Sequence, residues 1–255
     1  MELINYQTIK LQFRENISFL TFNRPESQNA INRQMIDECH TAIDLCLERA
    51  VNVILLRGSQ EAFCTGADFA ELSEHQYDNS EGVRLYRLWR RITEEAFVAI
   101  SQVQGKVTAG GMGFIAASDI VVAEPTASFA LSELLFGLFP ACVLPFLTRR
   151  TGFQKAHYLT ITTKPVSAEV AKELGIVDDY GTNSDEIVRR HFLRLGRLST
   201  KAIKKYKQYA SKMYGYIDSW ETAAVEANRE IFLDPDNRRA IANYASKGLF
   251  PWENR

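Results

Sequence analysis

The chain has 255 residues, of which 46% are hydrophobic and 24% charged, and its 30 lysines and arginines nearly balance its 31 acidic residues. This composition is typical of a globular protein, and the net charge of −1 excludes a strongly basic protein that coats nucleic acid. No apolar stretch approaches the roughly 20 residues of a membrane-spanning helix, and the N-terminal segment lacks the pattern of a secretory signal. We therefore expect a cytoplasmic protein that binds neither membrane nor nucleic acid.

Strand and helix patterns alternate along the first half of the chain. Strands are indicated by period-two alternation or short β-branched runs, and helices by apolar residues that recur every three to four positions. The predicted elements, in chain order, are strands at 9–13 and 17–22, a helix at 35–47, a strand at 51–57, helices within 69–95 around a polar break at 78–80, a strand at 97–103, a helix ending at Ala117, and strands at 120–123 and 127–131. This order predicts an α/β core with largely parallel strands.

The remainder of the chain is mostly helical. One helix is predicted near 144–150, and helical patterns dominate from Ser167 onward. We expect an α/β core over residues 1–190 and a helical region over residues 191–255, with a gradual boundary between them.

The cysteines show no pattern of a metal or disulfide site. Cys39, Cys46, Cys64 and Cys142 have neither CxxC spacing nor the histidine pairing of a zinc site. Cys39 and Cys46 fall on one stripe of a predicted helix, which indicates core packing. We expect reduced thiols and no bound metal.

Two loops with glycines join buried strands to helices, at residues 62–69 and 104–113. Glycine lets the backbone come close to a ligand, and the start of a helix offers free N–H groups. Two such loops could each aim one N–H at a single carbonyl oxygen and form an oxyanion hole. Either loop alone could equally be a tight turn.

Together with their flanking segments, these loops resemble the crotonase (enoyl-CoA hydratase/isomerase) superfamily. The matching segments are Phe22-Asn23-Arg24-Pro25 with Asn29-Ala30, Phe63–Asp68, Gln104-Gly105, Ala109-Gly110-Gly111, Ser118-Asp119-Ile120, and Ala127–Phe129 through Glu133 to Gly137 and Pro140. The resemblance extends over about residues 10–180. It implies a crotonase fold of repeated ββα units with a C-terminal helical trimerisation region, assembled as a homotrimer or hexamer.

The resemblance also implies a reaction in which two backbone N–H groups hold the enolate of an acyl thioester. These groups fall at Ala67 and Gly110. Hydratases of the family use two glutamates; the second matches Glu133, whereas Gly113 stands at the position of the first. A single carboxylate can take the α-proton and return it to the departing β-hydroxyl, so elimination with Glu133 as acid and base is expected.

Four further residues are candidates, and three of them have two interpretations. Asp68 is either a second catalytic carboxylate or the N-cap of the following helix. Lys106 either neutralises a carboxylate of the substrate or faces solvent. Tyr86, with Trp89, either lines the pocket or packs in the core. Gly113 would leave room for a substrate with a bulky β-carbon.

Several segments resemble one branch of the family, the dehydratase of bacterial polyketide β-branching. They are Gln104–Gly111, Ala127–Gly137, Phe139–Phe146, Gln154–Tyr158, Thr163–Pro165 and Phe250–Glu253. The resemblance implies dehydration of 3-hydroxy-3-methylglutaryl on an acyl carrier protein to 3-methylglutaconyl, with the substrate carried on a phosphopantetheine thioester and no other cofactor. The alternatives are a coenzyme A-dependent enoyl hydratase or isomerase, the companion decarboxylase, and a non-catalytic scaffold that docks carrier proteins or RNA.

Basic side chains recur on two predicted helices. Arg84, Arg87, Arg90 and Arg91 form a stripe, which could dock an acidic carrier protein, bind the phosphates of coenzyme A, or be solvated. A second group contains Lys201, Lys204, Lys205 and Lys207. For these lysines we expect a solvated surface.

Overall fold

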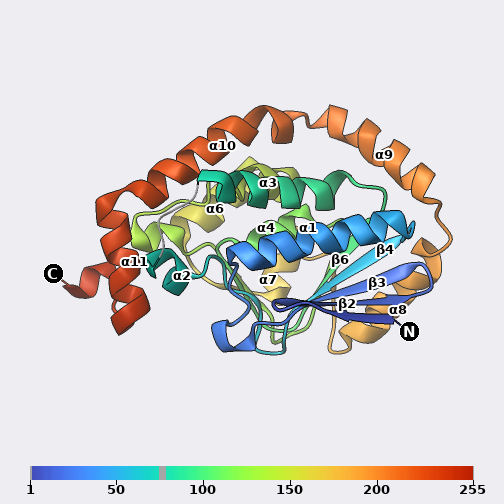
Figure 1. Cartoon of the computed structure of the whole chain (residues 1–255), viewed down its shortest axis with the longest axis horizontal. Helices are drawn as coiled ribbons and strands as arrows, with labels where there is room; N and C mark the ends of the chain where they lie inside the picture. The colour runs from blue at the N-terminus through green and yellow to red at the C-terminus, as the bar shows by residue number, and fades with distance from the viewer. Residues whose placement is uncertain (1, 75–78, 255) are drawn as a thin grey trace.

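The computed structural model describes residues 2–74 and 79–254, and it contains a seven-stranded sheet that lies in the lower part of the view in Figure 1. Its strands, in spatial order, are β1 (Glu2–Asn5), β2 (Ile9–Arg14), β3 (Ile17–Phe22), β4 (Val53–Arg57), β6 (Val98–Val103), β8 (Ile120–Ala123) and β11 (Asp179–Tyr180). The pairings β1–β2 and β2–β3 are antiparallel, whereas every pairing from β3 to β11 is parallel. The predicted α/β core with largely parallel strands is confirmed.

A second sheet consists of four short strands. In spatial order they are β10 (Val166–Ser167), β9 (Ser128–Ala130), β7 (Lys106–Thr108) and β5 (Ala62–Cys64). β5, β7 and β9 each follow a strand of the large sheet and precede a helix, which gives the repeated ββα units that the resemblance implied. β5 and β7 lie in the segments predicted as loops, 62–69 and 104–113, because three residues are too few to show an alternation pattern.

Helices cover both faces of the large sheet. Their bounds are α1 (Arg33–Glu48), α2 (Phe69–Glu74), α3 (Asn79–Glu94), α4 (Gly111–Ala117), α5 (Leu144–Thr151), α6 (Phe153–Thr162), α7 (Ala168–Glu173), α8 (Ser184–Leu195), α9 (Thr200–Met213), α10 (Tyr216–Leu233) and α11 (Pro235–Lys247), with 3-10 helices η1 (Pro25–Ser27), η2 (Glu133–Phe136) and η3 (Pro251–Asn254). On β4, Ile54 and Leu56 pack in the core with α1, α3 and α4, whereas Leu55 points to the opposite face and packs with α8. Because both faces are covered, the central strands are largely apolar throughout.

Two predicted boundaries, the polar break at 78–80 and the division at residue 190, can be compared with the structure. Of the predicted polar break at 78–80, Asn79 and Ser80 begin α3, and Asp78 lies outside the described residues. Residue 190 falls within α8. The division of the chain into an α/β core and a helical region stays a prediction.

Within the described ranges, no helix has the length and apolar character needed to cross a membrane.

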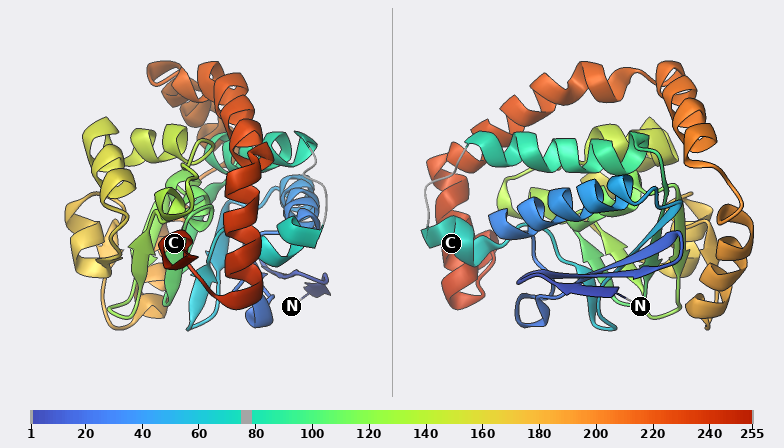
Figure 2. Two further views of the ribbon diagram at one scale, coloured as in Figure 1. Left: turned by 90° about the vertical axis from the view of Figure 1, so that its left-hand side faces the viewer. Right: turned by 45° about the vertical axis from the view of Figure 1, so that its right-hand side comes forward.

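The C-terminal helices form an arch over α3 (Figures 1 and 2). α9 and α10 both contact α3, and α11 then packs against α2. The end of the chain therefore lies beside the helix that follows the first glycine loop. A small separate hydrophobic core joins the η2 segment to α10 and α11. Its buried members are Phe136, Leu138, Ala141, Ile231 and Ile241.

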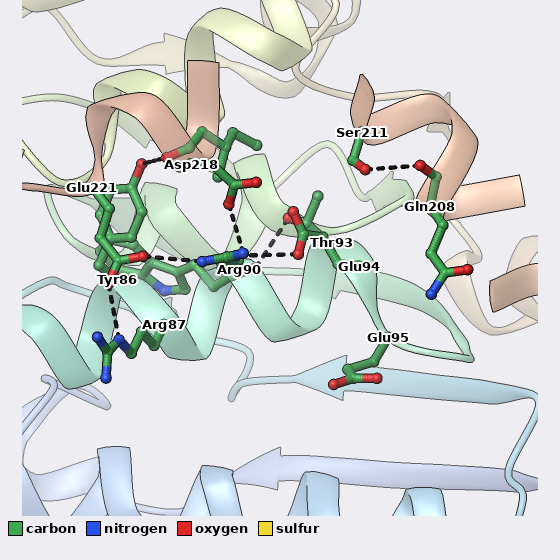
Figure 3. Close-up of polar contacts among 12 residues, drawn as sticks. Tyr86, Arg87, Arg90, Thr93, Glu94, Glu95, Gln208, Ser211, Asp218 and Glu221 are labelled. Carbon is green, nitrogen blue, oxygen red and sulfur yellow. Dashed lines mark hydrogen bonds and ion pairs between the residues drawn. The ribbon is translucent and has the colours of Figure 1, made fainter. Parts of the chain in front are cut away.

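The arginine stripe of α3 is tied to neighbouring helices. Arg90 lies 2.6 Å from Asp218 and 3.1 Å from Glu221, and Arg87 lies 2.8 Å from Glu221, so both anchor α10 (Figure 3). The other two pairs reach α1 and are Arg84–Asp37 and Arg91–Asp44. These carboxylates already neutralise the stripe, and this disfavours the docking and phosphate-binding interpretations.

The lysine group is only partly solvated. Lys201 and Lys205 are exposed, as expected. Lys207 is buried, and its ammonium lies 2.7 Å from Oδ2 of Asp119. The expectation of a solvated surface is therefore wrong for Lys207, whose charge is compensated inside the protein by an acidic residue from another part of the chain.

Candidate active site

A cavity of about 830 Å³ lies between the two glycine loops, α3, η2 and the C-terminal helices. The fold brings together, around this one space, residues that are far apart in the sequence. The predicted site residues in its lining are Ala67, Asp68, Lys106, Gly110 and Glu133. Within the described part of the chain, Tyr86 and Gly113 are not in the lining.

The first loop presents the Ala67 amide to the cavity. The Ile31 N–H donates to the Gly66 carbonyl at 2.7 Å, and the Asp68 N–H donates to the Ile31 carbonyl at 2.9 Å. These bonds fix the backbone on both sides of Ala67. Its own N–H has no backbone acceptor among the described residues, so it is available to a ligand.

The second loop places the Gly110 amide close by. A side-chain carbon on Gly110 would lie 3.8 Å from the Ala67 nitrogen. Gly66 has a φ of +93°, and a side-chain carbon there would lie 2.7 Å from that of Ala109, so glycine is required for this close approach. The Gly110 N–H also lacks a backbone acceptor within residues 2–74 and 79–254. Two neighbouring free donors are what an oxyanion hole needs.

Glu133 occupies the first position of η2 and lines the same cavity. Burial raises the pKa of its carboxyl to about 7, although hydrogen bonds from its own N–H and from Ser132 act in the opposite direction. Its Oε2 is buried and has no hydrogen-bond partner among the described residues. A carboxyl group with a pKa near neutrality can both take up and release a proton under physiological conditions.

Asp68 has both carboxylate oxygens engaged. Oδ1 accepts hydrogen bonds from the N–H groups of Ala70 at 3.1 Å and Glu71 at 3.2 Å, at the start of α2. Oδ2 lies 2.8 Å from Nη2 of Arg24. Of the two roles considered for Asp68, the structure displays the helix cap. Its geometry does not support a catalytic carboxylate, because neither oxygen lacks a partner.

Gly113 leaves room for Trp89 rather than for a ligand. A side-chain carbon on Gly113 would lie 2.2 Å from Cζ2 and 2.3 Å from Cε2 of the Trp89 indole. The expected role of Gly113 in direct substrate binding is therefore corrected: the indole covers it. Trp89 itself belongs to the cavity lining, so the glycine shapes the cavity indirectly.

Among the described residues, Lys106 lines the cavity, whereas Tyr86 does not. The Lys106 side chain is exposed on β7 at the edge of the cavity, and its ammonium has no acidic partner in the part of the chain that the structure describes. Tyr86 is fully buried, and its hydroxyl donates to the Ile217 carbonyl at 2.6 Å (Figure 3). Its role in substrate binding is corrected to core packing, since its one polar side-chain atom is used to fasten α10.

The wall supplied by the C-terminal helices was not predicted. Phe232 of α10, Tyr244 of α11 and Phe250 line the cavity. Phe136 of η2 packs against Tyr244 with ring centroids 5.0 Å apart and stacks on Phe250 at 5.5 Å. Phe250 belongs to a segment that carried the family resemblance, but no periodicity in the sequence connects it with the glycine loops.

Comparison with known proteins agrees with this geometry. The enoyl-CoA hydratase/isomerase family profile matches residues 12–255. The chain therefore belongs to this family, and it has the crotonase fold. Its sequence is 46% identical to the bacillaene synthase dehydratase PksH of Bacillus subtilis, over 100% of both chains.

Solved structures support the same relationship. The crystal structure of a polyketide biosynthesis enoyl-CoA hydratase (pksH) from Bacillus subtilis matches with a TM-score of 0.93 at 46% identity, covering 97% of this chain and 100% of that one. An enoyl-CoA hydratase/isomerase from Xanthobacter autotrophicus shares the fold at 23% identity, with a TM-score of 0.86 and coverage of 96% and 95%. The mitochondrial enoyl-CoA hydratase of Pongo abelii is 31% identical over 63% of this chain and 56% of its own.

Proposed function

We propose that this protein is a cytoplasmic hydro-lyase that removes water from a 3-hydroxy-3-methylglutaryl group on an acyl carrier protein, giving 3-methylglutaconyl in polyketide β-branching. The observation that carries the proposal is a buried carboxylate oxygen of Glu133, which has no partner among the described residues and shares its cavity with the amides of Ala67 and Gly110. Identity of 46% over the whole chain with a dehydratase of polyketide synthesis supports the reaction type and the setting.

The reaction needs one proton carrier and one anion site. The Glu133 carboxylate takes the α-proton of the thioester, and the N–H groups of Ala67 and Gly110 hold the charge on the resulting enolate oxygen. The electron pair then forms the double bond between the α- and β-carbons while the β-carbon–oxygen bond breaks. Glu133 returns its proton to the departing oxygen, which leaves as water, and the carboxylate is regenerated.

Lys106 is the proposed partner of the distal carboxylate of the substrate. Its ammonium is exposed at the cavity edge, and no acidic side chain among the described residues competes for it. The acyl group would arrive on a phosphopantetheine thioester, which requires no further cofactor. In this proposal Asp68 holds the loop and α2 in register and transfers no proton.

The assembly proposed for this enzyme is a homotrimer or hexamer. α6 and α9 expose large apolar side chains, which are Phe153, Ile161, Tyr206, Tyr209 and Met213. In this proposal neighbouring chains cover these side chains, since large exposed apolar patches occur at protein interfaces. Light scattering should give a multiple of three chains, and a monomer at micromolar concentration would contradict the proposal.

Intact-protein mass spectrometry tests the reaction. Carrier-bound 3-hydroxy-3-methylglutaryl is incubated with the protein, with the coenzyme A thioesters of 3-hydroxy-3-methylglutaryl and crotonyl groups in parallel. We expect loss of one water from the carrier-bound group, faster than from coenzyme A. Turnover of crotonyl-coenzyme A alone would identify a metabolic hydratase, loss of carbon dioxide a decarboxylase, and no turnover of any thioester would favour a scaffold.

A further inference from the structure

Two residues of the cavity lining each carry a buried polar side-chain atom without a partner among the described residues. Five buried side-chain nitrogen or oxygen atoms of the described residues lack a hydrogen-bond partner, and they belong to Arg57, Trp89, Gln102, Glu133 and Arg149. Of these residues, Trp89 and Glu133 line the cavity. One offers a donor, Nε1–H of the indole, and the other an acceptor, Oε2. Buried polar groups are nearly always hydrogen-bonded in folded proteins, so two exceptions in the lining of one cavity are candidate contacts for a bound molecule.

The Trp89 ring is fixed in place. It is 1% exposed, and it packs edge-to-face against Phe114 and Phe146 with centroids 6.1 and 5.9 Å away. The absence of a side chain on Gly113 admits the six-membered part of the indole, since Cζ2 and Cε2 lie 2.2 and 2.3 Å from where a side-chain carbon would stand, and Cε2 is the atom bonded to Nε1. The indole therefore occupies the space that a side chain at position 113 would fill.

We propose that the Trp89 indole N–H donates a hydrogen bond to the β-oxygen of the bound acyl group. The inference rests on the proposed function and names a group that recognises its substrate. An indole N–H is a donor only and does not ionise at neutral pH. It holds the leaving oxygen without protonating it, and the proton must come from Glu133. Although Glu133 is the one carboxylate in the proposed mechanism, the substrate then has two polar contacts at its reacting atoms, one with Glu133 and one with Trp89.

Comparing the binding of two ligands to two protein variants distinguishes this hydrogen bond from simple packing. Glu133→Gln protein, which should not turn over, is titrated calorimetrically with pantetheine thioesters of 3-hydroxy-3-methylglutarate and of 3-methylglutarate, which lacks the hydroxyl. In this background Trp89→Phe should weaken binding of the hydroxylated ligand about tenfold, the effect of one lost hydrogen bond. Binding of the ligand without the hydroxyl should change less than about twofold, because it makes no such bond.

Two further variants serve as controls. A benzothienylalanine at position 89 keeps the shape of the ring and replaces N–H by sulfur, so it should reproduce the loss even if Trp89→Phe folds poorly. Trp220→Phe, at a side chain that is 57% exposed, should change neither affinity. Equal weakening of both ligands, or of neither, would overturn the inference while leaving the proposed function intact. Failure of the Glu133→Gln protein to bind the hydroxylated ligand would overturn both.

Discussion

The two sides of the cavity present different kinds of chemical group, backbone amides on one side and side chains on the other. On one side, short strands of the small sheet and two glycine loops supply backbone groups, the amides of Ala67 and Gly110. On the other side, α3, η2 and the C-terminal helices supply side chains, among them Trp89, Glu133 and Tyr244. Backbone groups persist through most substitutions, whereas side chains change with each one. In the proposed reaction the first side supplies the amides that hold the enolate, and the second side supplies the carboxylate that moves the proton.

The largest effect is expected on the side-chain side, at Glu133. Glu133→Gln removes the proton carrier and should lower kcat by about 10²- to 10⁴-fold. In the unchanged protein, kcat/KM should rise as pH increases through about 7, because the carboxyl must be ionised to accept the α-proton. Steady-state kinetics with the carrier-bound substrate measure both.

A matched control is Glu169→Gln, which makes the same change at an exposed residue of α7. It should leave both kcat and the pH profile as they are. Full activity of the Glu133→Gln variant would remove the basis of the proposed mechanism.

On the backbone side, Ala67→Pro deletes the amide hydrogen that the enolate would need. The expected loss in kcat is about 10²- to 10³-fold, as for removal of one oxyanion-hole donor. Ala67→Ser retains the N–H and should stay active, and circular dichroism of both variants would exclude misfolding. Similar activities for the two variants would mean that this amide does not hold the enolate.

The buried carboxyl of Glu133 should also lower stability above its unfolded pKa. Its pKa is about 7 in the folded protein and 4.5 for a glutamate in water, so the unfolded chain loses the proton first and the free energy of unfolding falls as the pH rises from 4.5 to 7. At pH 8, Glu133→Gln should therefore stabilise the protein by at most about 3 kcal/mol. Urea unfolding at pH 5 and pH 8 measures the difference, and a variant that gains nothing at the higher pH would contradict it.

A smaller effect is expected where the two sides touch, at Gly113. Gly113→Ala places a carbon 2.2 Å from the Trp89 ring and should cost about 1–3 kcal/mol of unfolding free energy through overpacking. Combining it with Trp89→Ala should relieve the clash, so the two costs should not add in a double-mutant cycle. Additive costs would show that the two residues do not compete for space.

The smallest effect is expected at the rim. Lys106→Gln should raise KM for the 3-hydroxy-3-methylglutaryl thioester about tenfold, because one charge-assisted hydrogen bond is lost. An uncharged thioester should be unaffected. The matched control is Lys205→Gln, at another exposed lysine. Equal KM values for charged and uncharged acyl groups in the Lys106→Gln variant would exclude Lys106 as the carboxylate partner.

Sequence reasoning located the backbone side of the cavity better than the side-chain side. β2, β3 and α1 are long enough to display their periodicity, and the loops that contain Ala67 and Gly110 carry recognisable glycines. The contact of Trp89 with Gly113 joins two elements through tertiary packing, which no local pattern encodes. The burial of Lys207 and the pairing of the α3 arginines depend in the same way on acidic residues supplied by distant parts of the chain.

The arch of C-terminal helices has a consequence for the order in which the enzyme is made. Tyr244 and Phe250 leave the ribosome after every other residue that lines the cavity. The amides and the carboxylate are already in the nascent chain while the wall that encloses them is still missing. The cavity therefore closes only after α11 and Phe250 have been made, and a chain cut short in α11 would carry the reacting groups in a site open to water.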